Sequence, residues 1–339
     1  MLNFGIYTLN DNENFGNRLQ NYAVQYIFSK YGNVYNLQPR FPDLKTRLKY
    51  DLWKTTNGSI ERIFRNKNYR IYRAIEFNKG LNYKKKNTDF YIYGSDQIWN
   101  PYYAEEFLIN PTTPKEKNIA FCASFGISEI PQKYDKLFSE GLNHFGAISV
   151  REEAGADIVR KYTGKRPVVL LDPTMYVPAR HWRKIEKFPQ WLRTKKYVLL
   201  YFLGELSKER MKMIEEYAGV HSVEIVDLST VEFSGKTSPD EFLYLIDNAD
   251  YVVTDSFHGS VFSILFHTPF SVMSRSDKDT LMKSRTETLL NKFGLQNHFV
   301  SENGELCMGS DYSRIQEILE KERKKTDAFI TKAMGMEKN

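Results

Sequence analysis

The residues with the clearest chemical potential lie at 249–260, in the run Ala-Asp-Tyr-Val-Val-Thr-Asp-Ser-Phe-His-Gly-Ser. An apolar, β-branched stretch ends there in polar residues, and a helical pattern begins directly after them. In a parallel α/β sheet, ligands bind where the carboxyl end of a strand meets a helix N-terminus. Backbone N–H groups at such a terminus favour phosphate and carboxylate, and His258 adds a titratable imidazole. The pattern predicts acid–base chemistry on an anionic substrate.

Three further loops are predicted to join a strand to a helix, at 14–18, 94–100 and 149–153. In the last of them, Arg151 follows an apolar run and can fork onto a phosphate or carboxylate. The alternative for Arg151 is a surface ion pair with Glu152 or Glu153.

Asp96 and Cys122 are weaker candidates. Asp96 lies in a Gly-Ser-Asp-Gln turn, a sequence that is equally typical of an ordinary cap. Cys122 lies inside an apolar strand, where burial raises a thiol's pKa, so core packing is predicted instead of nucleophilic chemistry.

The elements that must position these residues alternate between strand and helix, which predicts parallel sheets covered by helices on both faces. Predicted strands run over 3–8, 89–93, 117–124, 147–150, 168–171, 197–203, 223–227, 251–254 and 270–273. Ser238, Pro239 and Glu241 form a capping-box pattern that predicts a helix start.

The order of elements predicts two Rossmann-like doubly wound domains facing across a cleft. Residues 1–175 form the first, the proline- and tryptophan-rich segment 176–196 connects them, and 197–339 form the second. The C-terminal helix is expected to pack back on the N-terminal domain.

Composition indicates a globular protein, with 41% hydrophobic and 27% charged residues among 339. No signal peptide, membrane-length apolar run or paired-cysteine metal motif is visible, which predicts a cytoplasmic location. No GxGxxG follows the first strand, so a dinucleotide site has little support.

Positive charge gathers in an insertion at 45–86, which carries thirteen Lys or Arg against three acidic residues, with large aromatics between them. Such a segment suits an anionic membrane surface, a solvated helical face or nucleic acid, but no nucleic-acid motif accompanies it. Co-sedimentation with anionic liposomes, wild type against a multi-Lys→Ser variant of 45–86, tests the membrane interpretation. Equal, salt-insensitive binding would count against it.

At these loops the chain resembles the polysaccharide pyruvyl transferase family. The matching pieces occur in the family's order at 15–23 (FGNRLQNYA), 93–100 (YGSDQIWN), 148–152 (ISVRE), 171–174 (LDPT) and 254–260 (TDSFHGS).

The resemblance implies a glycosyltransferase-B-like fold and a transfer of pyruvate from phosphoenolpyruvate onto two hydroxyls of a sugar, as a ketal in a surface polysaccharide or glycan precursor. Phosphoenolpyruvate is then a co-substrate, with no cofactor and no metal. The acceptor is a sugar or an oligosaccharide on polyprenyl diphosphate, which suggests contact with the inner face of the membrane through 45–86.

The resemblance also implies site residues. His258, Arg151 and Asp96 are the catalytic candidates: general acid or phosphate partner, anion clamp, and base or acceptor ligand. The implied donor-binding residues are Arg151, Ser256, His258, Gly259, Ser260, Lys278 and Arg285, with the N–H groups of Gly259 and Ser260 available to phosphate. The implied acceptor-binding residues are Asn17, Arg18, Asn21, Ser95, Asp96 and Gln97.

Two other functions remain open at this point. A nucleotide-sugar-dependent glycosyltransferase of the same architecture would bind a nucleoside diphosphate. A non-catalytic sugar- or anion-binding protein would bind its ligand and release no phosphate.

Overall fold

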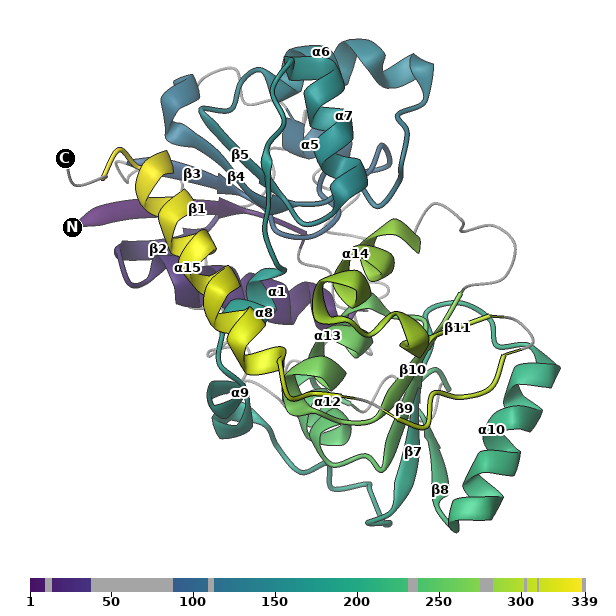
Figure 1. The fold of residues 1–339 in the computed structure, drawn as a ribbon. Helices are drawn as coiled ribbons and strands as arrows, with labels where there is room; N and C mark the ends of the chain where they lie inside the picture. Colours follow the sequence, from purple (N-terminus) through teal and green to yellow (C-terminus); the bar gives the residue numbers. More distant parts are fainter. Residues whose placement is uncertain are drawn as a thin grey trace, which may run out of the picture. The chain divides into compact units, whose positions relative to one another are not determined.

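The computed structural model describes residues 1–9, 14–37, 88–108, 113–230, 237–274, 283–301, 304–309 and 311–336. They form two compact units, Met1–Thr174 with Lys324–Asn339 and Met175–Arg323. Each unit is α/β with a parallel sheet, so the predicted class of two Rossmann-like domains is confirmed (Figure 1). The basic stretch 45–86 and Lys278 lie outside the described residues.

The first unit is built on a six-stranded parallel sheet of order β2-β1-β3-β4-β5-β6. Its strands are β1 (Leu2–Tyr7), β2 (Gly32–Asn36), β3 (Phe90–Tyr93), β4 (Asn118–Ala123), β5 (Ala147–Val150) and β6 (Val168–Val169). Its helices are α1 (Phe15–Phe28), α5 (Ala104–Leu108), α6 (Asp135–Leu142) and α7 (Glu153–Thr163), with 3₁₀ turns η1 (Lys115–Lys117) and η2 (Gln132–Tyr134).

β2 is a strand that the sequence did not reveal. Its residues, GNVYN, contain a glycine and two asparagines, which favour turns over strands. Parallel pairing with β1 over Leu2–Ile6 holds it in the sheet, and this tertiary pairing outweighs the local preference.

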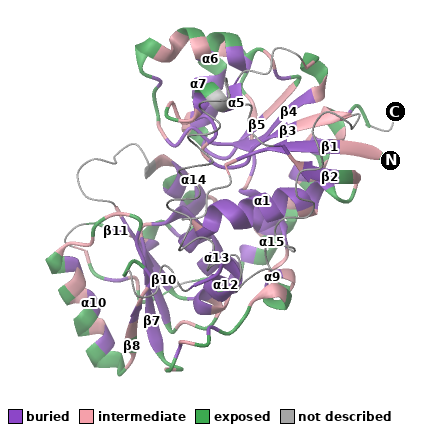
Figure 2. Ribbon diagram, turned by 180° about the vertical axis from the view of Figure 1, so that it is seen from behind, coloured by how far each residue is buried: buried purple, intermediate pink, exposed green. Residues whose placement is uncertain are grey.

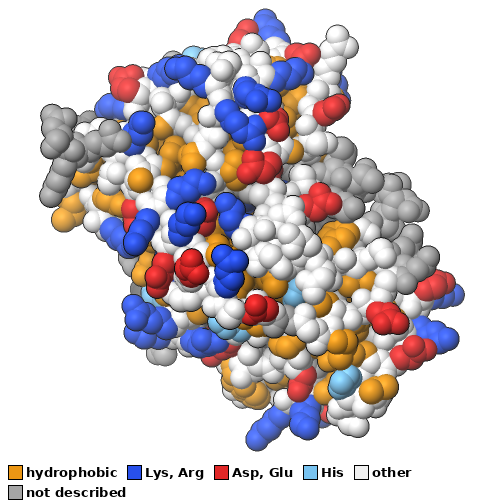
Figure 3. Space-filling model, viewed as in Figure 1, with side chains coloured by type: hydrophobic (Ala, Val, Ile, Leu, Met, Phe, Trp, Pro, Cys, Tyr) orange, Lys and Arg blue, Asp and Glu red, His pale blue; other side chains and the backbone are white. Residues whose placement is uncertain are grey.

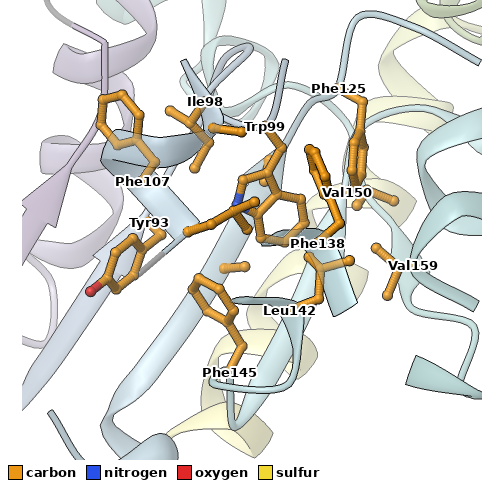
Figure 4. Packing of buried hydrophobic residues seen from close by; sticks show 14 of the residues in the cluster. Tyr93, Ile98, Trp99, Phe107, Phe125, Phe138, Leu142, Phe145, Val150 and Val159 are labelled. Atoms are coloured by element: carbon orange, nitrogen blue, oxygen red, sulfur yellow. The ribbon is translucent and has the colours of Figure 1, made fainter. Parts of the chain in front are cut away.

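The aromatic core of the first unit fixes the loop after β3. Trp99 is fully buried and its ring lies 5.2 Å from Phe125 and 5.4 Å from Phe145, between centroids. Ile98 and Tyr93 enter the same cluster (Figure 4). Because Trp99 anchors the loop in the core, the polar residues just before it are held in place.

The second unit is built on a five-stranded parallel sheet of order β11-β10-β9-β7-β8. Its strands are β7 (Tyr197–Tyr201), β8 (Glu224–Asp227), β9 (Tyr251–Thr254), β10 (Phe270–Met273) and β11 (Phe299–Val300). Its helices are α9 (Ala179–Ile185), α10 (Lys208–His221), α12 (Pro239–Asp247), α13 (Phe257–Phe266) and α14 (Lys283–Phe293), with the turn η4 (Gln296–His298).

The predicted capping box of α12 is confirmed, because the Ser238 N–H donates to Glu241 Oε2 at 2.9 Å. The segment 176–196, expected to connect the domains, instead belongs to the second unit and contains α9. Trp182 explains this: it is fully buried and packs edge-on against Phe262 of α13, with ring centroids 5.3 Å apart.

Helices differ in how much of their surface is covered. α13 is buried along its whole length, whereas α10 exposes most of its residues (Figure 2). A helix that is buried all round needs apolar residues on every face, and after its first turn α13 (FHGSVFSILF) is apolar except for Ser263, whose hydroxyl donates to the Gly259 carbonyl.

The chain passes from one unit to the other within two helices. These are α8 (Pro173–Tyr176) and α15 (Ile315–Ala333). In the first unit, Lys325 Nζ donates to the Val169 carbonyl at 2.7 Å. Along α15, Lys and Arg side chains lie among Asp and Glu side chains (Figure 3). Among the described residues, no helix combines the length and apolarity needed to cross a bilayer.

Glu186, which ends α9, makes the stability of this protein depend on pH. Burial and the neighbouring Asp247 carboxylate raise the pKa of Glu186 to about 7, against an opposing effect of Arg183. An unfolded chain releases this proton near pH ~4.3. The contribution of Glu186 to stability is therefore fully present below that pH and is lost as pH rises through about 7.

In Glu186→Gln the side chain at this position is uncharged in the folded and in the unfolded protein, so the variant is not expected to lose this stability as pH rises. The Tm of the variant minus that of the wild type should grow between pH 5 and pH 8, by about 1–3 °C. A difference that stays constant over this range would show that Glu186 does not titrate in this way.

Candidate active site

The first candidate cluster lies at the carboxyl edge of the six-stranded sheet, between β1 and β3. Because β2 and β3 pair with opposite edges of β1, the strand order reverses at this point. Open α/β sheets bind ligands at such a reversal. Thr8 follows β1 and the turn 94–96 follows β3, so both segments reach this edge.

Asp96 is the centre of this cluster and has a backbone φ of +72°, a conformation that Asp tolerates better than most residues. Its carboxylate accepts hydrogen bonds from Asn17 Nδ2 at 3.1 Å, Arg151 Nη2 at 2.8 Å and the Gln97 N–H at 2.8 Å. Three donors hold the carboxylate in one orientation. The structure thus brings together Asn17, Asp96, Gln97 and Arg151.

The Arg151 side chain is fully buried and ion-paired twice, with Asp96 at 2.8 Å and with Asp172 at 2.6 Å. Burial alone would lower the pKa of this guanidinium, but the two carboxylates raise it above its ordinary value. One cation between two carboxylates leaves net negative charge. An anionic ligand at Arg151 would compete with both carboxylates, so the arrangement fits the orientation of Asp96 better than the capture of an anion.

Asp172 is a residue of this cluster to which the sequence assigned no role. Its Oδ1 accepts from the Thr174 N–H at 3.0 Å and from Thr174 Oγ1 at 2.7 Å, which leaves Oδ2 facing Arg151. The available signal was the Asp-Pro-Thr sequence at 172–174, shortly after β6, because Asp side chains in loops bond to nearby backbone N–H groups.

A buried hydrogen-bond chain supports the turn that carries Asp96. Gln20 Nε2 donates to Thr8 Oγ1 at 2.9 Å, and Thr8 Oγ1 donates to the Ser95 carbonyl at 2.9 Å. Ser95 Oγ in turn donates to the Cys122 carbonyl at 3.1 Å. Ser95, expected to bind the acceptor, therefore donates its hydroxyl proton into the sheet and fixes the turn.

Strand β4 packs closely against this turn. Gly94 has a φ of +119°, and a Cβ there would lie 2.3 Å from the Phe121 carbonyl oxygen, so only glycine fits. Cys122 is fully buried, and burial raises the pKa of its thiol well above the ordinary value. The prediction of core packing for Cys122 is confirmed.

The remaining acceptor candidates have structural contacts within the same unit. On α1, Asn21 Oδ1 accepts from Gln25 Nε2 at 3.0 Å, and Arg18 is buried in the same helix. The Gln97 side chain lies against Gly126, where an added Cβ would be 2.2 Å from Gln97 Nε2. These contacts order α1 and the turn.

The second candidate cluster lies at the carboxyl edge of the five-stranded sheet, between β7 and β9. Because β8 and β9 pair with opposite edges of β7, the strand order reverses here as well. Asp255 joins the two strand ends: its carboxylate accepts from the Leu203 N–H at 2.7 Å and the Gly204 N–H at 2.8 Å.

The first turn of α13 corrects one expectation. The Gly259 N–H donates to Ser256 Oγ at 3.4 Å and the Ser260 N–H to the Ser256 carbonyl at 3.1 Å. The expectation that both groups are available to a phosphate is wrong, because Ser256 caps the helix and occupies them. A Cβ on Gly259 would lie 2.6 Å from Thr254 Oγ1, so glycine lets the helix approach β9 closely.

His258 and Arg285 are brought into one cluster through Phe257. The His258 and Phe257 rings meet edge to face with centroids 5.4 Å apart, and the Arg285 guanidinium lies 5.5 Å from the centre of the Phe257 ring. Both His258 and Arg285 are buried, and they come from α13 and α14. Of the predicted donor-binding residues, His258 and Arg285 both contact Phe257.

The two clusters differ in the charged groups that they contain. The cluster of the first unit contains the carboxylates of Asp96 and Asp172, which can accept hydrogen bonds from the hydroxyls of a neutral ligand. The cluster of the second unit offers a guanidinium and an imidazole, which suit an anion.

Solved structures place the architecture in a known class. UDP-N-acetylglucosamine 2-epimerase from Rickettsia bellii is similar with a TM-score of 0.51, 9% identity and coverage of 99% of this chain and 97% of that chain. A functionally uncharacterized protein from Klebsiella pneumoniae has a TM-score of 0.47 and 14% identity, over 88% of this chain and 92% of that chain. At these identities the similarity concerns the fold alone, and the epimerase supports the glycosyltransferase-B-like class.

The search of curated proteins gave no match. The family model for polysaccharide pyruvyl transferase matches residues 14–277, which include Asp96, Arg151 and His258 but not Arg285. The chain belongs to the polysaccharide pyruvyl transferase family.

Proposed function

We propose that this protein transfers the pyruvyl group of phosphoenolpyruvate onto two hydroxyls of a sugar, forming a pyruvate ketal in a surface-polysaccharide or glycan precursor. The observation that carries the proposal is the pairing of His258 with Arg285 around Phe257, at the carboxyl edge of β9. Phosphoenolpyruvate has a phosphate and a carboxylate, and it reacts by taking up a proton. A buried guanidinium and an imidazole that contact the same aromatic ring meet both requirements.

The reaction balances without an added reductant or oxidant. The methylene carbon gains a proton, which leaves an oxocarbenium-like centre at the adjacent carbon. Two sugar hydroxyls add to that carbon, and the C–O bond to phosphate breaks. One hydroxyl proton replaces the proton given to carbon, and the other leaves with the phosphate.

His258 is proposed as the acid that protonates the methylene carbon, and Arg285 as the cation that holds the phosphate. A general acid of this kind contributes about 10²–10⁴-fold to the rate. Ser256 is proposed to act through the helix, because its side chain caps the first turn of α13 and so orients His258.

Asp96 is proposed as the ligand of the acceptor hydroxyls. Its bonds to Asn17, Gln97 and Arg151 fix its orientation, which suits the alignment of a diol. Arg151 and Asp172 are then positioning residues that act through Asp96. The acceptor is a sugar, free or carried on polyprenyl diphosphate.

Ligand protection distinguishes this function from a nucleotide-sugar glycosyltransferase. Phosphoenolpyruvate is expected to raise the Tm of the protein, because it binds the folded state alone. Protection by nucleoside diphosphates without protection by phosphoenolpyruvate would favour the glycosyltransferase. Protection by phosphoenolpyruvate without phosphate release from it would favour a binding protein.

A further inference from the structure

Arg210 occupies a position in α10 where an apolar residue is expected. The buried residues of α10 are Arg210, Ile214 and Ala218, which recur at i, i+4 and i+8 and form the face that packs on the sheet. Arg210 is only 4% exposed. This buried face of α10 therefore has an arginine at its N-terminal end, beside the carboxyl edge of the sheet.

No carboxylate of the described residues lies within 4.0 Å of the Arg210 guanidinium. Its hydrogen bonds go to Ser274, from Nη1 to the carbonyl and from Nη2 to Oγ at 3.1 Å. Its Nε is buried and has no hydrogen-bond partner among the residues that the structure describes. The buried Arg151 differs, because it has two carboxylate partners. A buried guanidinium with no counter-ion among the described residues is suited to an anionic ligand.

The position of Arg210 is set by the sheet order. α10 follows β7 and Ser274 follows β10, and β9 lies between these two strands. The bond from Arg210 to Ser274 therefore spans the carboxyl end of β9. Asp255 ties the loop before α10 to the same strand end through Leu203 and Gly204. Arg210 thus belongs to the edge where α13 begins, with His258 in the first turn of that helix.

We propose that Arg210 is a binding residue for an anionic oxygen group at this edge, and that in the reaction it holds the carboxylate or the phosphate of phosphoenolpyruvate. The second half of this statement rests on the proposed function. A guanidinium binds such a group with a fork of N–H donors, and burial strengthens the bond. With Arg285, the edge then has one cation for each anionic group of the donor.

The test compares the dissociation constants of inorganic phosphate and of phosphoenolpyruvate for the wild type and for Arg210→Met, by isothermal titration calorimetry. Loss of a charge-assisted bond is expected to weaken both by about tenfold or more. Arg183→Met is the matched control, because Arg183 of the same unit is already bonded to Asp247 at 2.7 and 2.8 Å and should leave both constants unchanged. Circular dichroism checks the fold of each variant. If Arg210→Met does not fold, Arg210→Lys replaces it, and its affinity for both anions is expected to be about threefold or more weaker than that of the wild type.

The outcomes separate the two proposals. Weaker phosphate binding in the Arg210 variant, with a wild type that does not bind phosphoenolpyruvate, would support the anion site and contradict the proposed function. Unchanged constants in the variant would overturn the role of Arg210 whatever the wild type catalyses. A wild type that binds neither compound would overturn it as well.

Discussion

Replacing His258 by alanine is expected to abolish phosphate release from phosphoenolpyruvate, with a rate loss of about 10²–10⁴-fold. The reason is that the methylene carbon then has no positioned acid. The fold should persist, because Ser256 and not His258 caps α13. Initial rates of phosphate release, with circular dichroism as a check of folding, measure the effect.

His267 is the matched control for this variant because it lies at the other end of the same helix. It ends α13 with a φ of +61°, and its ring stacks on Tyr312 with centroids 5.2 Å apart. His267→Asn keeps a residue that tolerates this conformation and should retain the wild-type rate. A rate in His258→Ala equal to that of His267→Asn would remove His258 from the mechanism.

The second large effect concerns stability. Arg151→Met is expected to lower the free energy of unfolding by about 3–5 kcal/mol, because it leaves Asp96 and Asp172 buried without their cation. Arg166→Met removes an exposed arginine that pairs with Glu153 and Asp157, and it should cost only about 0–1 kcal/mol. Urea unfolding of both variants provides the comparison.

The triple variant Arg151→Met with Asp96→Asn and Asp172→Asn separates charge from packing. Removing both carboxylates should recover part of the lost stability, since no uncompensated charge is then buried. Equal stability losses in the Arg151 and Arg166 variants would contradict the view that the buried cluster holds the first unit together.

Much of the fold follows from local patterns in the sequence. The apolar runs at 197–201 and 251–254 became the buried strands β7 and β9, and the capping-box residues began α12. The segment 249–260 was correctly interpreted as a strand end followed by a helix. Patterns of this kind depend on neighbours within a few residues, so one sequence suffices to predict them.

The partners of Arg151 could not be predicted in the same way. Glu152 is adjacent in sequence, but it has φ −136° and ψ 149°, and side chains of successive extended residues point to opposite sides. Its carboxylate accepts from the Phe125 N–H at 2.7 Å. The actual partners of Arg151 lie 55 and 21 residues away and meet it only in the folded sheet.

The burial of Arg210 could not be predicted from the sequence either. The residues around it indicate an ordinary charged helix, and a lysine or arginine in such a helix is usually exposed. Only the burial of its side chain and the position of Ser274 distinguish it. Both depend on the packing of α10 on the sheet.

The most direct test of the central claim is phosphate release from phosphoenolpyruvate over a panel of sugars with 4,6-diols or 3,4-diols, with product analysis by mass spectrometry. The proposal predicts that one sugar of the panel gives equimolar phosphate and pyruvate ketal with the wild type, and none with His258→Ala. Phosphate release without a ketal, or ketal formation that does not depend on His258, would contradict it.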